Sequence, residues 1–131
     1  MNRHPVRVYF EDTDFSGRVY HGAFVRFLER GRTEFLRESG VDHTALAQGT
    51  PPLFFTLRAM HLGFAGPAFI DDLLTVETEP TGAGRAVFTM AQRILRADRA
   101  IVTATVELCL IDATGRPSRP PAAVAARLKP A

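Results

Sequence analysis

The sequence predicts an α+β domain in which one long helix covers one face of an antiparallel sheet. Residues 24–36 place apolar side chains at helical spacing, whereas residues 6–10 and four later segments have the apolar patterns of strands. Short links join the last four segments, largely as a meander, which favours antiparallel pairing. A chain of 131 residues is long enough to bury a core, so we expect a single domain over residues 1–131.

Composition narrows the classes of function. Hydrophobic residues at 46% and charged residues at 23% are ordinary for a globular protein, and a net charge of +2 is too small to favour nucleic-acid binding. Cys109 is the only cysteine, which excludes an internal disulfide. The four histidines are dispersed without the spacing of a metal site, so we expect neither a metal nor a cofactor. No stretch approaches the ~20 apolar residues of a membrane span, and no signal peptide is evident, so we expect a cytoplasmic protein.

The first half of the chain predicts a strand, a loop and the long helix. Val6, Val8 and Phe10 alternate with polar residues, as in a half-buried strand, and an acidic loop follows over residues 12–20. The helix begins near Gly22 and stops at Gly40. Its apolar face is Phe24, Phe27, Leu28, Gly31, Phe35 and Leu36, and its polar face is Arg26, Glu29, Arg30, Arg32, Arg37 and Glu38. Glycine inside a helix is unfavourable, so Gly31 indicates close approach to a sheet.

The second half predicts four strands and a tail. Residues 53–64 are apolar on both faces, as in a strand covered on both sides, and residues 73–79 alternate. The other assignments are a turn or short helix over 41–49, a turn over 80–84, strands over 85–95 and 100–111 with a turn between them, and a tail over 116–131 that is partly helical or mobile.

The loop and the start of the helix carry the chemistry. A carboxylate at Asp14 and an imidazole at His21 flank a helix N-terminus, where free N–H groups and the helix dipole favour negative charge. This combination suits acyl transfer, in which negative charge develops on a carbonyl oxygen. The N–H of Gly22 is free to polarise that oxygen. From the residues alone, Asp14 is equally well explained as an exposed loop aspartate.

The motif Tyr9-x-x-Asp12-Thr13-Asp14-x-x-Gly17-x-Val19-Tyr20-His21, followed by Phe27-x-Glu29-Arg30-x-Arg32, resembles the hotdog-fold acyl-CoA thioesterases. Within them it is most similar to the 4-hydroxybenzoyl-CoA thioesterase branch that includes the Tol-Pal-associated acyl-CoA thioesterases. The likeness continues through Gly66-Pro67-Ala68 and Asp71-Asp72-Leu73 and covers about residues 5 to 115. It implies a five-stranded antiparallel sheet wrapped around one long central helix.

The resemblance also implies roles for particular residues. Asp14 matches the family's catalytic carboxylate, as base or nucleophile, and His21 matches its histidine at the mouth of the helix. Tyr20, Gly22 and Phe24 are expected to bind substrate, although Ala23-Phe24 departs from the Asn-Tyr common in the family. Asp12 is expected to fix the loop through backbone hydrogen bonds, with the working acid as its alternative role. Phe54 and Phe55 are candidate walls of an acyl pocket.

We therefore expect a thioester hydrolase that acts on acyl-CoA or acyl-carrier-protein thioesters. The alternatives are a hydratase, whose motif we do not find, and a non-catalytic acyl-CoA-binding module. In the resembled fold the strand after the helix lies at the sheet edge, and an unpaired apolar edge invites association. We thus expect a homodimer or homotetramer in which residues 53–64 meet a partner and active sites are shared.

Overall fold

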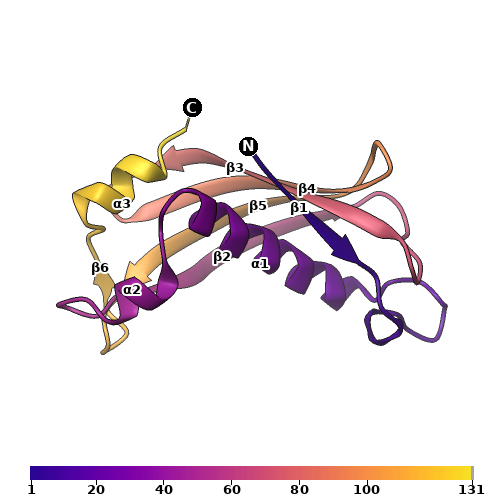
Figure 1. Cartoon of the computed structure of the whole chain (residues 1–131), viewed down its shortest axis with the longest axis horizontal. Coiled ribbons are helices and arrows are strands. Elements are labelled where there is room, and N and C mark those ends of the chain that lie inside the picture. Colours follow the sequence, from indigo (N-terminus) through magenta and orange to yellow (C-terminus); the bar gives the residue numbers. More distant parts are fainter. Residues whose placement is uncertain (131) are drawn as a thin grey trace.

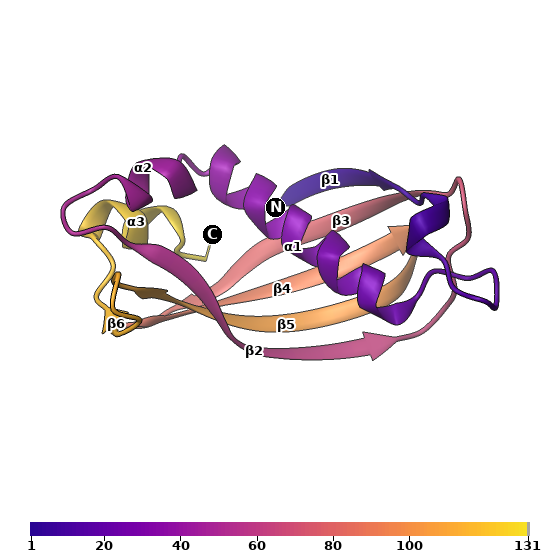
Figure 2. The ribbon, with the colours of Figure 1, turned by 90° about the horizontal axis from the view of Figure 1, so that it is seen from below.

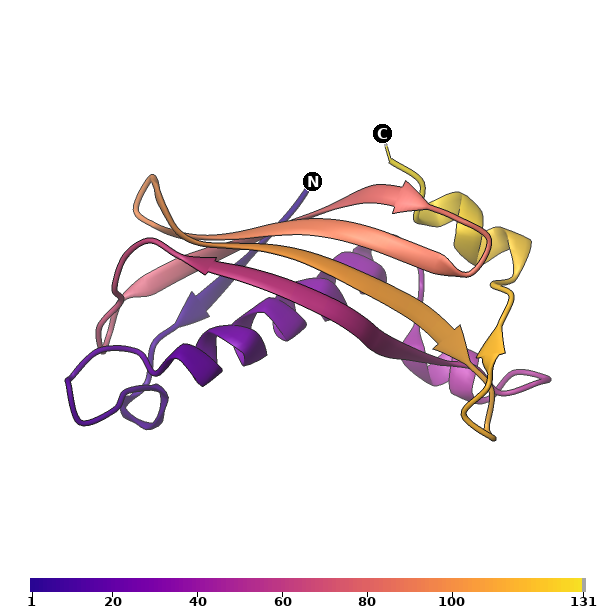
Figure 3. The ribbon, with the colours of Figure 1, turned by 180° about the vertical axis from the view of Figure 1, so that it is seen from behind.

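A helix of 18 residues, α1 (His21–Glu38), lies across one face of an antiparallel sheet in the computed structural model, which describes residues 1–130 (Figure 1). Seen from behind, the far face of the sheet carries no helix within these residues (Figure 3). The α+β architecture expected from the sequence is confirmed. None of the helices in residues 1–130 is long and apolar enough to cross a lipid bilayer.

The sheet has the strand order β1-β3-β4-β5-β2, with a short β6 added to β5 (Figure 2). The strands are β1 (Asn2–Arg7), β2 (Phe54–Phe64), β3 (Leu73–Ala83), β4 (Val87–Arg96), β5 (Arg99–Ile111) and β6 (Pro117–Ser118). Only β3, β4 and β5 form a meander. β2 pairs with β5, for example Met60 with Val106, so the expected meander of four strands is wrong for β2.

The link between β2 and β3 explains this departure. Residues 65–72 cross the end of the sheet and are held there by backbone hydrogen bonds. Ala65 N–H donates to Ile101 O at 2.8 Å, and Val19 N–H donates to Ala68 O at 2.9 Å. These bonds tie the link both to β5 and to the loop before α1. β3 therefore starts on the far side of β4 and β5 from β2.

Two strand ends also differ from expectation. β1 ends at Arg7, and residues 10–12 form a 3-10 turn, η1 (Phe10–Asp12), so Phe10 is 81% exposed instead of continuing the buried side of a strand. β3 continues through the expected turn to Ala83. Its register shifts between Pro80 and Gly82, because proline has no N–H for the ladder and is accommodated at a bulge.

The inner stripe of α1 packs on β1 and β3. Phe27 and Leu28 are fully buried there together with Val76 of β3. A Cβ atom at Gly31 would overlap Val76 Cγ1 and lie 3.2 Å from Thr78 Oγ1. The close approach expected at Gly31 is confirmed, and it is what allows the helix backbone to lie directly on the sheet.

β2 forms the edge of the sheet opposite β1. Phe54, Leu57 and Phe64 are 41%, 43% and 53% exposed, so in the single chain this strand is not covered on both faces. The expectation of full coverage is wrong, because α1 packs mainly on β1 and β3 and leaves much of β2 uncovered. An apolar edge strand with free backbone groups favours pairing with another chain.

The remaining elements close the other end of the molecule. α2 (His43–Ala47) begins at Asp42, whose carboxylate accepts the Thr44 N–H at 2.9 Å, and it satisfies the expected helical turn. In the tail, α3 (Ala122–Arg127) buries Val124 and Leu128 against the core. The helical alternative for the tail is thus confirmed for residues 122–127.

Candidate active site

A tight loop between η1 and α1 carries Asp14 out to the surface. Thr13 and Val19 form an antiparallel bridge, and Asp14 N–H donates to Arg18 O at 3.0 Å. Gly17 turns the loop with a φ of 80°, a conformation that glycine adopts without strain, and its N–H donates to Asp14 O. The loop thus presents Asp14 beside the first turn of α1.

The Asp14 carboxylate is exposed and held by one neighbour. Its Oδ1 accepts the Ser16 N–H at 2.8 Å and the Ser16 hydroxyl at 2.6 Å. These two bonds are the main causes that lower the pKa of Asp14; desolvation opposes them, and the charges of His21 and Arg18 lower the pKa further. Asp14 is therefore ionised at neutral pH, and Oδ2 forms no hydrogen bond within residues 1–130.

Asp12 has a different environment. It is 3% exposed, and its Oδ2 accepts the Tyr9 N–H at 2.8 Å while its Oδ1 lies 3.4 Å from Arg26 Nη2. Its backbone oxygen accepts the Tyr20 N–H at 2.8 Å. Asp12 joins the ends of the loop through backbone bonds, as expected, and does not face solvent.

Three consecutive residues shape the start of α1. The rings of Tyr20 and His21 are in tilted contact, with 4.3 Å between centroids. The Tyr20 ring also lies over Gly22, where an added Cβ would come within 2.5 Å of it. The amides of the first helical positions have no intrahelical acceptor. The N–H of Gly22 is therefore available to an incoming oxygen, with no side chain of its own in the way.

An aromatic cluster lies behind His21. Phe24 is buried, and its ring centroid is 6.1 Å from those of Phe27 and Phe64. Phe64, at the end of β2, also meets His21 edge-on at 6.5 Å. Phe24 is thus beneath the site instead of projecting into it. Sequence reasoning missed Phe64, because only folding brings the end of β2 to the start of α1.

The space around Asp14 is an open hollow. It is lined by Phe10, Thr13, Asp14, Phe15, Gly17 and Ile70. Phe15 has no packing partner at all within the described chain, with a relative exposure of 109%. In a single chain, the Asp14 carboxylate therefore lies in a largely apolar hollow that is open to solvent.

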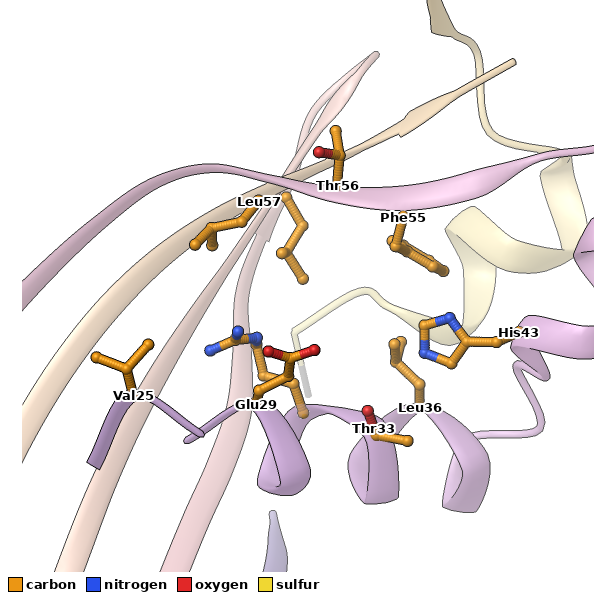
Figure 4. Close-up of a pocket in the computed structure, with 10 residues that line it drawn as sticks. Val25, Glu29, Thr33, Leu36, His43, Phe55, Thr56 and Leu57 are labelled. Atoms are coloured by element: carbon orange, nitrogen blue, oxygen red, sulfur yellow. The ribbon is translucent and has the colours of Figure 1, made fainter. Parts of the chain in front are cut away.

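A second, more enclosed pocket lies between α1, α2 and β2 (Figure 4). Val25, Glu29, Thr33 and Leu36 of α1 face Phe55 and Leu57 of β2, and His43 closes one end. Phe55 lines this pocket, as expected for an acyl-pocket wall, whereas Phe54 does not. Arg32 also lines it and is buried, so its assignment to the polar surface of the helix is wrong.

Two titratable groups beside the start of α1 are a carboxylate and an imidazole, Asp14 and His21. Within residues 1–130, no group of three or more His, Cys, Asp or Glu side chains is placed to hold a metal ion. An ionised carboxylate, an imidazole and a free amide at a helix N-terminus are sufficient to deliver or activate a nucleophile and to stabilise an oxyanion.

A curved antiparallel sheet over one long helix, with a carboxylate loop leading into that helix, defines a domain of the hotdog thioesterase type. The chain belongs to the Thioesterase-like superfamily, whose family model matches residues 8–128. It is 38% identical over 108 residues to the acyl-CoA thioesterase YbgC of Haemophilus influenzae, covering 82% of this chain and 79% of that protein. It is 36% identical over 129 residues to the acyl-CoA thioester hydrolase YbgC of Escherichia coli, covering 97% and 95%.

Solved structures agree with this assignment. A probable thioesterase from Bartonella henselae superposes with a TM-score of 0.89 at 47% identity and covers 92% of this chain and 98% of its own. A protein from Aquifex aeolicus superposes with a TM-score of 0.90 at 27% identity, covering 98% and 100%. The expected fold is thereby confirmed.

Proposed function

We propose that the protein hydrolyses acyl-CoA thioesters to a free acid and CoA. The observation that carries this proposal is an ionised carboxylate, Asp14, in the loop that leads directly into α1, whose first turn leaves the N–H of Gly22 free. The names of the relatives that are 36% and 38% identical support the same activity. We also propose that the chain falls in the branch that includes the Tol-Pal-associated acyl-CoA thioesterases.

The proposed chemistry begins at the thioester carbonyl. Either Asp14 takes a proton from water as the water oxygen bonds to the carbonyl carbon, or Asp14 attacks that carbon and water then cleaves the mixed anhydride. In both routes the carbonyl oxygen becomes an oxyanion, which the Gly22 N–H stabilises. The oxyanion then collapses, the C–S bond breaks and the thiolate leaves; in the second route this step forms the mixed anhydride, which water cleaves afterwards. Both routes require Asp14 to be ionised, which its lowered pKa provides.

The other residues of the site position the substrate. His21 orients the carboxylate, the attacking water or the thioester, and the Tyr20 ring lines the approach to Gly22. Phe24 supports both from below together with Phe64. An acyl-carrier-protein thioester is an alternative substrate, since it presents the same reacting group.

We propose that the active form is a homodimer joined through β2, or a homotetramer built from two such dimers. The exposed apolar side chains of β2 and the open hollow at Asp14 support this, because a partner at that edge would cover both. The whole chain would act as one domain, with the tail packed on it. Cys109, buried and unpaired, is consistent with a reducing cytoplasmic location.

The test is turnover of an acyl-CoA panel by the purified protein, with a thiol reagent that reports released CoA. The panel should span short and long aliphatic chains and aromatic acyl groups. We expect at least one member to be hydrolysed with a kcat/KM in the enzymatic range, above about 10⁴ M⁻¹s⁻¹. Tight binding of acyl-CoA without any release of thiol would contradict the proposal and favour an acyl-CoA-binding module.

A further inference from the structure

Arg32 is a buried charge without an ion-pair partner. It is 7% exposed, on the fourth turn of α1, and none of the ion pairs within residues 1–130 involves it. A buried guanidinium is costly unless an opposite charge accompanies it. Glu29 carries a negative charge that acts on Arg32, but its side chain is exposed and lies beyond ion-pair distance.

The guanidinium is held in place from behind. Arg32 Nη1 donates to Gln92 Oε1 at 3.0 Å. The orientation of Gln92 is itself fixed, because its Nε2 donates to Leu28 O and to Thr78 Oγ1, both at 2.9 Å. This buried network consists of neutral groups. It fixes the orientation of the Arg32 guanidinium but supplies no negative charge to balance it.

The remaining N–H groups of Arg32 face open space. Within residues 1–130, Asn2 Oδ1 is the only fully buried side-chain polar atom that lacks a hydrogen bond. The free guanidinium nitrogens are therefore not sealed in the core, and Arg32 lines the pocket between α1 and β2. The other walls are mixed: Val25, Leu36 and Leu57 are apolar, whereas Glu29, Thr33 and His43 also line the pocket.

The pocket is the size of a small acyl group. Its volume is about 160 Å³. A cavity of about 150 Å³ holds a benzene-sized molecule. The pocket therefore has room for a chain of a few carbons, and Arg32 forms the polar end of the pocket.

We infer that Arg32 anchors a carboxylate at the far end of a short acyl chain, so that the preferred substrates are thioesters of short dicarboxylic acids. The planar guanidinium fits a carboxylate through two parallel hydrogen bonds, and the ligand would supply the missing opposite charge. This inference rests on the proposed thioesterase function and adds a specificity residue to it.

The pocket that serves a given Asp14 belongs to the partner subunit. His21 and Arg32 are eleven positions apart on α1, roughly 16 Å at the rise of a helix, too far for a short chain within one subunit. Antiparallel pairing of β2 with its copy would place the Phe64 end of one strand beside the Phe55 end of the other. The acyl group held at His21 would then enter the partner's pocket.

The kinetic test compares glutaryl-CoA with valeryl-CoA, which have equally long chains but differ in the terminal charge. We expect wild-type protein to prefer glutaryl-CoA in kcat/KM by at least about tenfold, the scale of one charge-assisted hydrogen bond. Arg32→Gln should abolish this preference, Arg32→Lys should restore part of it, and Glu29→Gln should increase it. Arg37→Gln, on the exposed last turn of the same helix, is the matched control and should leave it unchanged.

A preference that is absent in wild-type protein, or that survives in Arg32→Gln, would overturn the inference. Binding of the non-hydrolysable thioether S-(4-carboxybutyl)-CoA, measured by calorimetry against its uncharged pentyl analogue, tests Arg32 without turnover. Stronger binding of the carboxylate in wild-type protein alone supports the anchor, and equal binding of the two contradicts it. Failure to hydrolyse any thioester, with this binding difference retained, would instead reject the catalytic proposal. Inhibition of wild-type turnover by glutarate but not by pentanoate is expected even if the Arg32 variants do not fold.

Discussion

The hydroxyl and the backbone N–H of Ser16 both donate to the same oxygen of Asp14, at 2.6 Å and 2.8 Å. This leaves Oδ2 to face an incoming group, and it lowers the pKa of the carboxyl. The carboxylate of Asp14 is thus held in one orientation by a residue two positions away in the same loop.

The first prediction concerns pH. Asp14 must be ionised to act, so activity falls as pH drops through its pKa. Ser16→Ala removes the hydroxyl bond, which is the largest cause of the lowered pKa, and should raise it. The acid limb of the kcat/KM profile should therefore move to higher pH in Ser16→Ala, whereas Ser118→Ala, far from the site, should match wild type. Superimposable acid limbs in all three proteins would show that this bond does not set the titration.

The second prediction separates the two aspartates by stability. Asp12→Ala leaves the Tyr9 N–H without its acceptor, in a region where Asp12 itself is 3% exposed. A hydrogen bond to a charged group contributes about 1.5–3 kcal/mol, and Tyr9 itself is exposed, so the free energy of unfolding should fall by an amount near the lower end of that range. Asp14→Ala should change stability little, because Asp14 is exposed. Denaturant unfolding of both variants makes the comparison, and equal losses would mean that Asp12 does not join the loop ends.

The third prediction concerns the contact of α1 with β3. Gly31→Leu should overpack the interface at Val76 and cost about 1–3 kcal/mol of unfolding free energy. Gly31→Ala should also be destabilising, and adding Val76→Ala should recover part of that loss, since it removes the methyl groups that meet the new Cβ. Thermal and denaturant unfolding of the single and double variants measure this coupling. Simple additivity of the two substitutions would argue against a direct contact.

The fourth prediction concerns assembly. At micromolar concentration, sedimentation should find a dimer or larger assembly. Phe54→Glu, on the exposed edge strand and outside both pockets, should shift it towards monomer and lower activity in parallel. Leu73→Glu, also exposed but on β3, is the matched control and should assemble normally. A fully active wild-type monomer would refute the shared site.

The helix and its inner face could be predicted from the sequence, because the periodicity of α1 records which side is buried. The place of β2 could not, because strand patterns do not say which neighbour a strand pairs with, and the link over residues 65–72 decides this through its hydrogen bonds to β5 and to the loop before α1. The turn predicted over residues 80–84 is also wrong, because a proline usually ends a strand, whereas here a bulge accommodates Pro80 inside β3.

The candidate site divides in the same way. Asp14, Tyr20, His21 and Gly22 are close in sequence, so one motif contains them. Phe64 and Arg32 depend on tertiary contacts. An arginine at the border of the apolar stripe of a helix normally extends to solvent, and the hydrogen bond to Gln92, sixty residues further on, holds Arg32 in its buried position. Buried polar networks of this kind leave no local signal in a sequence.

The most direct test of the proposed function is the turnover number of Asp14→Asn on the best acyl-CoA substrate. The substitution keeps the size of the side chain but removes its basicity and nucleophilicity, so kcat should fall by at least roughly a hundredfold with little change in substrate affinity. Asp12→Asn should be much milder, and His21→Ala intermediate. Assembly and unfolding of each variant are checked in parallel. If Asp14→Asn kept more than about a tenth of the wild-type kcat, the carboxylate would have no place in the mechanism.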